Sequence, residues 1–176
     1  MRDVTLGIFE NQNDAEHAIK ELESRGFSTK NISILMKEPE GYVVQNGNST
    51  AENVTEGAVS GATTGSLLGG LAGLLIGIGA IAIPGVGGLL IGGPLAVALG
   101  LTGAAATTVS GAVTGAAAGG LVGALAGLGL PEDRAEAYAS SIEEGGVMIA
   151  VSNWTGDPKE ARDVLKNHGA TQVDTL

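Results

Sequence analysis

The sequence predicts an α+β fold: a ferredoxin-like four-stranded sheet made of two βαβ halves, with an inserted glycine-zipper α-helical hairpin. Two observations lead to this prediction. The two ends of the chain share one strand-helix-strand pattern, and the residues between them, 57–131, contain no charged side chain and carry glycine at every fourth position over long stretches. The predicted divisions are residues 1–53 for the first half and a polar loop, 54–130 for the hairpin, and 131–176 for the second half.

The first half begins with residues 4–8, where apolar side chains alternate with Thr or Gly, the pattern of a half-buried strand. A helix follows, with Asn13 or Asp14 available to cap its start and Gly26 suited to end it. Apolar residues alternate again over residues 32–36, which predicts a second strand.

The second half opens with a helix that starts at Pro131 and ends near Glu144. A strand over 147–151, a helix over 157–169 and a last strand over 171–176 repeat the pattern of the first half, at an offset of 143 residues. Because neither half could bury its apolar side chains alone, we expect one sheet with its helices on one face.

The middle segment contains two copies of one glycine-rich pattern, over residues 57–75 and 111–129. Successive glycines four residues apart form a slanted groove on a helix, and such a groove lets another backbone approach closely. Each glycine lies about 40° further around the helix axis than the glycine four residues before it. A long row therefore implies either several neighbours per helix, as in an oligomer, or a right-handed supercoil. The predicted helix-packing and oligomerisation residues are Gly57, Gly61, Gly65, Gly69, Gly73, Gly77, Gly111, Gly115, Gly119, Gly123 and Gly127.

Residues 57–83 are long enough as a helix to span a bilayer, residues 95–130 can form the return helix, and Pro84 and Pro94 bracket the expected turn. Backbone groups in lipid must bond internally, which favours a helix despite its glycines. Acidic flanks and the lack of an aromatic belt oppose a simple transmembrane hairpin, so a soluble helix-packed oligomer stays open.

The composition excludes several function classes. A net charge of −10 opposes nucleic-acid binding, and the absence of cysteine removes thiolate chemistry and cysteine-based zinc sites. We interpret His17 and His168 as solvated surface histidines, and the pairs Glu21/Glu23 and Glu143/Glu144 as solvated helix faces. We expect Trp154 to cover a sheet edge rather than stack on a ligand. No convergent catalytic set is present, so we predict no enzyme activity, no cofactor and no metal.

The chain resembles the bacterial general stress proteins, some of which are called low-temperature-induced proteins. The resemblance rests on the opening strand over residues 4–9, the segments 15–18 and 31–34, the glycine-rich insertion and the strand start at Gly145-Gly146-Val147. It implies stress-linked expression and no established catalytic activity, and it supplies no functional residues.

The leading functional hypothesis is a non-enzymatic stress protein that inserts in or associates with the bacterial inner membrane and self-associates, with its α/β domain in the cytoplasm. One alternative is a cytoplasmic self-assembling protein, a cage, rod or bundle, whose hairpins are buried between subunits. The third is a small-ligand sensor that uses the sheet. The expected partners are other copies of the chain and a lipid bilayer.

Overall fold

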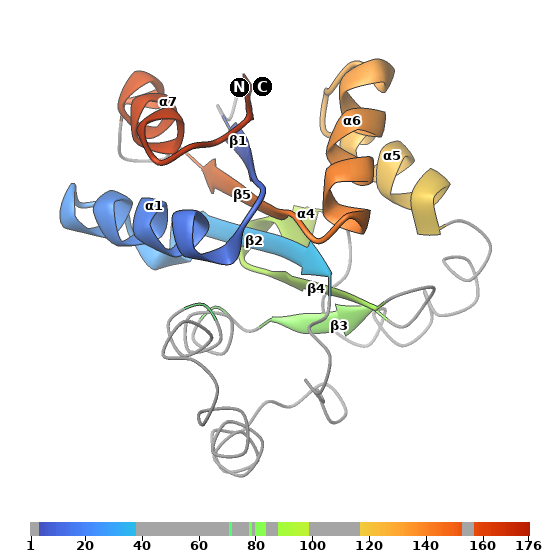
Figure 1. Ribbon diagram of the computed structural model, residues 1–176, viewed down its shortest axis with the longest axis horizontal. Helices are drawn as coiled ribbons and strands as arrows, with labels where there is room; N and C mark the ends of the chain where they lie inside the picture. The colour runs from blue at the N-terminus through green and yellow to red at the C-terminus, as the bar shows by residue number, and fades with distance from the viewer. Residues whose placement is uncertain are drawn as a thin grey trace, which may run out of the picture.

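The computed structural model describes residues 4–37, 71, 78, 80–83, 88–98, 117–152 and 157–176. These residues form an α+β fold, which confirms the predicted class (Figure 1). The elements in chain order are β1 (Val4–Phe9), α1 (Gln12–Ser24), the 3-10 turn η1 (Thr29–Asn31), β2 (Ile32–Lys37), β3 (Ile81–Ile83), β4 (Leu89–Gly92), α4 (Pro94–Ala98), α5 (Ala117–Gly127), α6 (Glu132–Glu143), β5 (Val147–Ser152), α7 (Pro158–Asn167) and β6 (Gln172–Thr175).

All the strands in the described ranges belong to one antiparallel sheet in the order β3-β4-β2-β5-β1-β6. The four strands predicted from the two ends of the chain lie side by side as β2-β5-β1-β6. The predicted total of four strands is wrong, because β3 and β4 extend the sheet beyond β2 to six strands. Each outer strand of the central four pairs with a strand from the other half of the sequence, so neither half forms the sheet alone.

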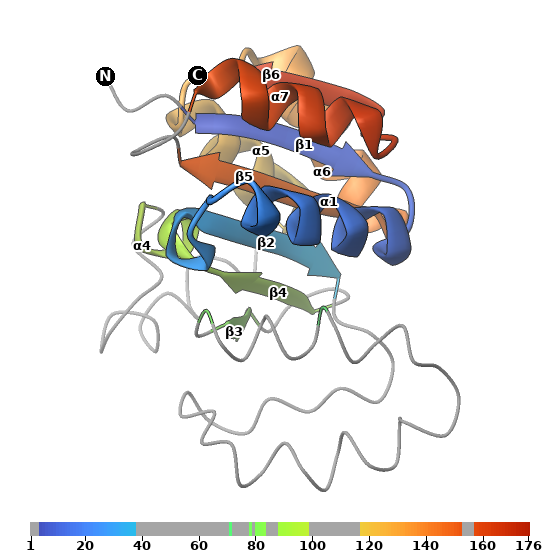
Figure 2. The same ribbon diagram turned by 90° about the vertical axis from the view of Figure 1, so that its left-hand side faces the viewer.

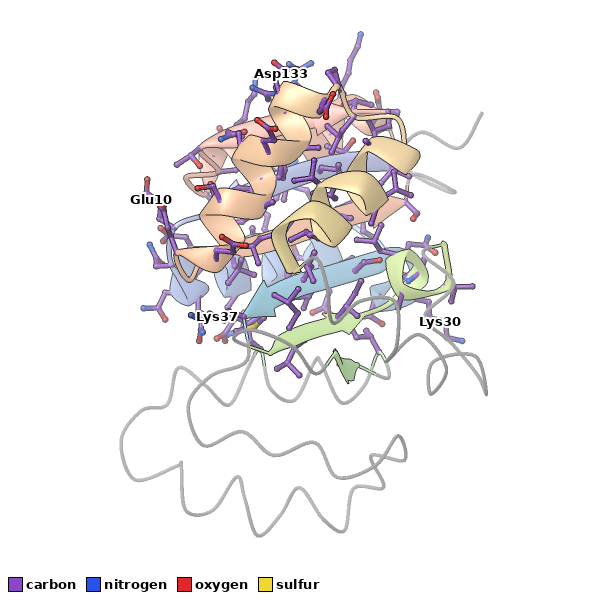
Figure 3. The ribbon with its side chains drawn as sticks, turned by 90° about the vertical axis from the view of Figure 1, so that its right-hand side faces the viewer. Glu10, Lys30, Lys37 and Asp133 are labelled. Atoms are coloured by element: carbon purple, nitrogen blue, oxygen red, sulfur yellow. The ribbon has the colours of Figure 1, made fainter. Side chains whose placement is uncertain are left out.

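Helices cover both faces of the sheet, which corrects the prediction of helices on one face. Figure 2 shows α1 and α7 lying over one face, and Figure 3 shows α5 and α6 over the opposite face. The strands explain this arrangement because they are apolar on both sides. In β5, Val147, Ile149 and Val151 enter the core beneath α1 and α7, whereas Met148 and Ala150 enter the core beneath α5 and α6. A strand that is apolar at successive positions must be buried on both faces.

The helix ends follow from local chemistry. Asn11, rather than Asn13 or Asp14, caps α1, and its Oδ1 accepts a 2.9 Å hydrogen bond from the Asp14 backbone N–H. Asp157 caps α7 in the same way, with Pro158 in the first turn, where no intrahelical N–H is needed. Gly145 and Gly169 follow α6 and α7 with φ angles of 102° and 88°, which reverse the chain at little steric cost.

The described part of the middle segment is not a continuous helical hairpin. Ile81–Ile83 form an edge strand where we predicted the end of a helix, and Leu89–Gly92 pair with β2 where we predicted a turn. The apolar run at 89–91 supplies this pairing, because Leu90 and Ile91 are buried on opposite faces of the sheet. The prediction of a helix up to residue 83 is wrong because uncharged apolar composition does not distinguish a strand from a helix.

Gly93 allows the chain to turn from β4 into α4 against β2. Its φ is 88°, and a Cβ built there would lie 2.4 Å from the carbonyl oxygen of Ile32. The buried Ser33 hydroxyl accepts a 2.9 Å hydrogen bond from the Leu95 backbone N–H at the start of α4. The inserted segment is thereby attached directly to the central sheet.

Among the helices in the described ranges, none has both the length and the apolar character that crossing a bilayer requires.

Candidate functional site

Helix α5 has one buried face and one open face. Leu121 and Leu125 are 8% and 0% exposed and belong to the core beneath α5 and α6. Gly123 and Gly127 lie on the outer side, and a Cβ built at either glycine would meet no atom within 4 Å. The helix is therefore held by its leucines, and its glycines leave backbone uncovered in the described structure.

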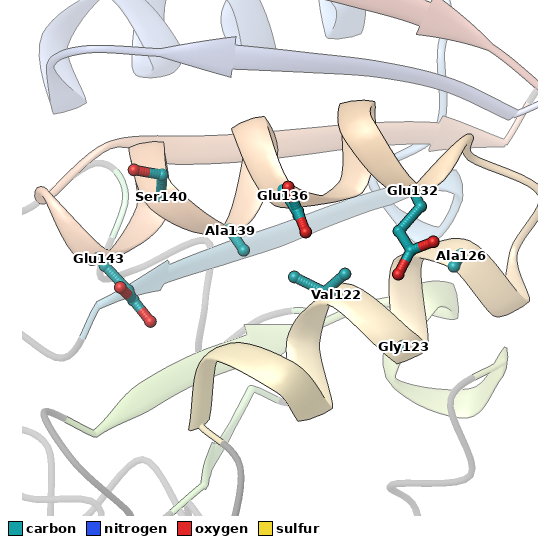
Figure 4. A pocket seen from close by; sticks show the side chains of 8 residues that line it. All are labelled: Val122, Gly123, Ala126, Glu132, Glu136, Ala139, Ser140 and Glu143. Carbon is teal, nitrogen blue, oxygen red and sulfur yellow. The ribbon is translucent and has the colours of Figure 1, made fainter.

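A groove runs between α5 and α6 along this open side (Figure 4). It encloses about 690 Å³. The residues that line it are Val122, Gly123 and Ala126 of α5, and Glu132, Glu136, Ala139, Ser140 and Glu143 of α6. Its α5 side is apolar or without a side chain, and its α6 side is mostly acidic.

The acidic side consists of Glu132, Glu136 and Glu143, which are all exposed. Their spacing of four and seven residues places all three on one stripe of α6, within about 40° around the helix axis. None of them forms an ion pair with another residue in the described ranges. The arrangement combines a small-residue floor with a line of unpaired carboxylates, and it can receive a group that is apolar at its centre and cationic at its edge.

Arg134, the basic residue of α6, pairs with Asp174 of β6 and not with the three glutamates. The Arg134 Nε donates a 3.2 Å hydrogen bond to Oδ2 of Asp174 in β6. The Tyr138 hydroxyl donates to the same carboxylate oxygen at 2.9 Å. Burial raises the pKa of the Tyr138 phenol well above its usual range, and the Asp174 carboxylate raises it further. This network fixes α6 to the edge strand and holds the acidic stripe on the outer side of the helix.

The opposite face of the sheet carries a second charged cluster. His168, at the end of α7, hydrogen-bonds to the Glu21 carboxylate of α1, and Arg25 pairs with Glu21 and with Glu160. The His168 hydrogen bond, followed by that of Arg25, lowers the pKa of Glu21. His168 and Glu21 are partly exposed surface residues that also pair with each other, and the sequence could not show this pairing because α1 and α7 are far apart in the chain. His17 is exposed and stacks on His168 with 6.5 Å between ring centroids.

Of the predicted helix-packing glycines, Gly119, Gly123 and Gly127 lie in α5. Trp154 and the remaining predicted glycines, Gly57, Gly61, Gly65, Gly69, Gly73, Gly77, Gly111 and Gly115, lie outside the described residues. Within the described ranges, no group of three or more His, Asp or Glu side chains is placed to hold a metal ion. The groove itself was missed, although the spacing of Glu132, Glu136 and Glu143 was a visible signal for an acidic stripe.

Residues 4–79 match the family model for the heat induced stress protein YflT domain. This match, over the N-terminal part of the chain, supports a bacterial general stress protein family. This confirms the resemblance seen in the sequence. The match covers β1, α1 and β2 and continues to residue 79, so it ends before the α5–α6 groove begins. No curated protein and no solved structure matches the chain significantly.

Proposed function

We propose that this stress-associated protein is not an enzyme and that it self-associates through its glycine-rich helices. The observation that carries the proposal is the open face of α5, where a Cβ built at Gly123 or Gly127 would meet no atom within 4 Å while Leu121 and Leu125 of the same helix are buried. Each exposed glycine destabilises a helix by about 1 kcal/mol relative to alanine. Close packing of another helix backbone against the glycines can offset this loss.

We infer that the scaffold for this association is a ferredoxin-like unit. The antiparallel order β2-β5-β1-β6 supports this inference, as do the two crossover helices α1 and α7 on one face. The glycine-zipper segment would then be an insertion between the two βαβ halves. β4 and α4 attach the described part of this segment to the sheet beside β2.

We further propose that the inserted segment associates with the bacterial inner membrane, with the sheet domain in the cytoplasm. The uncharged run over residues 57–131 supports this proposal. The alternative is a cytoplasmic assembly in which the same segments cover one another. Ligand sensing by the sheet is the third candidate, and no residue in the described part of the structure favours it over the first two.

Fractionation of the full chain, followed by size-exclusion chromatography with light scattering, tests these proposals. Recovery in the membrane fraction with release by detergent supports membrane association, whereas a uniform detergent-free oligomer supports the soluble assembly. A monomer in both conditions would contradict self-association. The double variant Gly123→Leu/Gly127→Leu should lower the oligomer mass, because the two side chains keep neighbouring backbones apart.

A further inference from the structure

We propose that the groove between α5 and α6 is a docking site for a cationic amphipathic helix of another protein. This interaction differs from self-association, since it involves a different partner and the acidic side of α6, and the two would compete for the surface at Gly123. The inference rests on the shape of the groove, on its charge, and on the lack of a matching segment within this chain.

The floor of the groove suits apolar side chains of moderate size. Val122 and Ala126 of α5 are partly exposed apolar residues, and Gly123 between them in the sequence adds no side chain (Figure 4). Helix-in-groove recognition uses such a surface, with anchors from successive turns of the docked helix. The absence of a side chain at Gly123 is what gives an incoming anchor room.

The charge of the groove selects a cationic partner. Glu132, Glu136 and Glu143 extend along α6 over about 16 Å, which is roughly three helical turns. A docked helix that places Lys or Arg at similar intervals would pair with all three carboxylates. The net charge of −10 of the whole chain would also speed the approach of such a partner.

The chain itself does not offer this partner. Residues 57–131 carry no charge, so another copy of the glycine-rich segment could cover Gly123 but would leave the glutamates unpaired. Helix α7 carries the exposed cations Lys159, Arg162 and Lys166, but the apolar residues of that helix are buried against the sheet. A helix from another protein, with basic and apolar faces together, fits both sides of the groove.

The test uses a fluorescent synthetic 18-residue helical peptide with leucine and alanine on one face and lysine on the other. Its binding to the full chain is measured by anisotropy, with a peptide of the same composition in scrambled order as the reference. We expect the amphipathic peptide to bind saturably and more tightly than the scrambled one. Equal binding of the two peptides would overturn the proposal, because it would show attraction by net charge alone.

Charge variants separate the groove from the rest of the acidic surface. Glu132→Gln/Glu136→Gln/Glu143→Gln should weaken binding about tenfold, the sum expected of three exposed ion pairs. The matched control Glu10→Gln/Glu23→Gln/Asp163→Asn removes the same charge from exposed positions outside the groove and should bind almost as the unmodified chain does. An equal loss in both triple variants would overturn the proposal.

A pair of shape variants in α5 separates this proposal from self-association. Gly123→Leu fills the groove and should reduce peptide binding, whereas Gly127→Leu makes the same change in the same helix outside the groove lining. Both variants should keep the circular dichroism spectrum of the unmodified chain, because neither new side chain meets an atom near its Cβ. Unchanged peptide binding in Gly123→Leu would contradict docking. Self-association is measured separately, as the oligomer mass of both variants by light scattering.

Discussion

The two helix pairs that cover the sheet differ in how completely they are closed. On one face, α1 and α7 are joined across their outer surfaces by the contacts of Glu21 with His168 and of Arg25 with Glu160. On the other face, α5 and α6 share a core but leave a groove with exposed glycines on one side and unpaired glutamates on the other. The first pair is thus closed by side chains of both helices, whereas the second pair leaves surface uncovered in the described structure.

The largest expected effects come from removing the core anchors of the two pairs. Leu165 of α7 and Leu125 of α5 are both 0% exposed. Leu165→Ala and Leu125→Ala should each lower the free energy of unfolding by about 3 kcal/mol, because each leaves a cavity in a closed core. Urea denaturation measures both values. A much smaller loss for Leu125→Ala would show that α5 is not firmly docked in solution and would weaken the case for a preformed groove.

The next effect concerns the network that holds α6 to β6. Tyr138→Phe removes the hydrogen bond to Asp174 and should lower the free energy of unfolding by about 1 kcal/mol at neutral pH. The raised pKa of Tyr138 means that the unfolded chain ionises this phenol first. Its contribution to stability is therefore complete below about pH 10 and is lost as the pH rises further.

The difference in the free energy of unfolding between Tyr138→Phe and the unmodified chain should therefore become smaller above about pH 10. The reason is that the variant has no ionisable group at position 138. Denaturation of both proteins at several alkaline pH values measures this difference, and the other titrating groups cancel in the comparison. A deficit that stays constant with pH would show that the phenol is not shielded from water in the folded protein.

A smaller effect of opposite sign is expected for the open glycines. Gly123→Ala and Gly127→Ala should each raise the helical stability of the dissociated chain by up to about 1 kcal/mol, because alanine favours a helix and its Cβ meets no neighbour. If self-association covers these glycines, the same variants should weaken the oligomer. Denaturation is measured at protein concentrations below and above the one at which the chain assembles. The first series reports the stability of the dissociated chain and the second that of the oligomer.

The smallest effect concerns the charged cluster that closes α1 onto α7. The lowered pKa of Glu21 means that its contribution to stability is present above the ordinary glutamate pKa and is lost as the pH falls through and below that value. Glu21→Gln should reduce the acid sensitivity of unfolding slightly, since water screens an exposed cluster. Glu23→Gln, at an exposed position of the same helix with no ion pair in the described ranges, is the matched control for the loss of one negative charge.

Much of the central fold could be predicted because its signals are local. Alternating or continuous apolar residues located the strands of both halves, and Asp157-Pro158 and Gly145 located helix ends. The strands at 81–83 and 89–92 could not be predicted in the same way. Uncharged apolar residues between glycines suit a buried strand as well as a helix, and only the pairing of β4 with β2 and of β3 with β4 decides between them.

The candidate site was predictable only in part. The sequence singled out Gly123 and Gly127 through their four-residue spacing, and the stripe of Glu132, Glu136 and Glu143 follows from helical periodicity alone. That these two features form opposite sides of one groove depends on the packing of α5 against α6. Similarly, the contact between His168 and Glu21 joins residues from the two halves of the chain.

The sequence by itself determined the α+β class, the two related halves and the uncharged glycine-rich segment, because composition and periodicity act through neighbours along the chain. The tertiary structure decided that helices cover both faces, that part of the inserted segment joins the sheet, and which glycines stay open. Those outcomes depend on which apolar surfaces meet in space, and the free energy of burying them is shared between residues far apart in the chain.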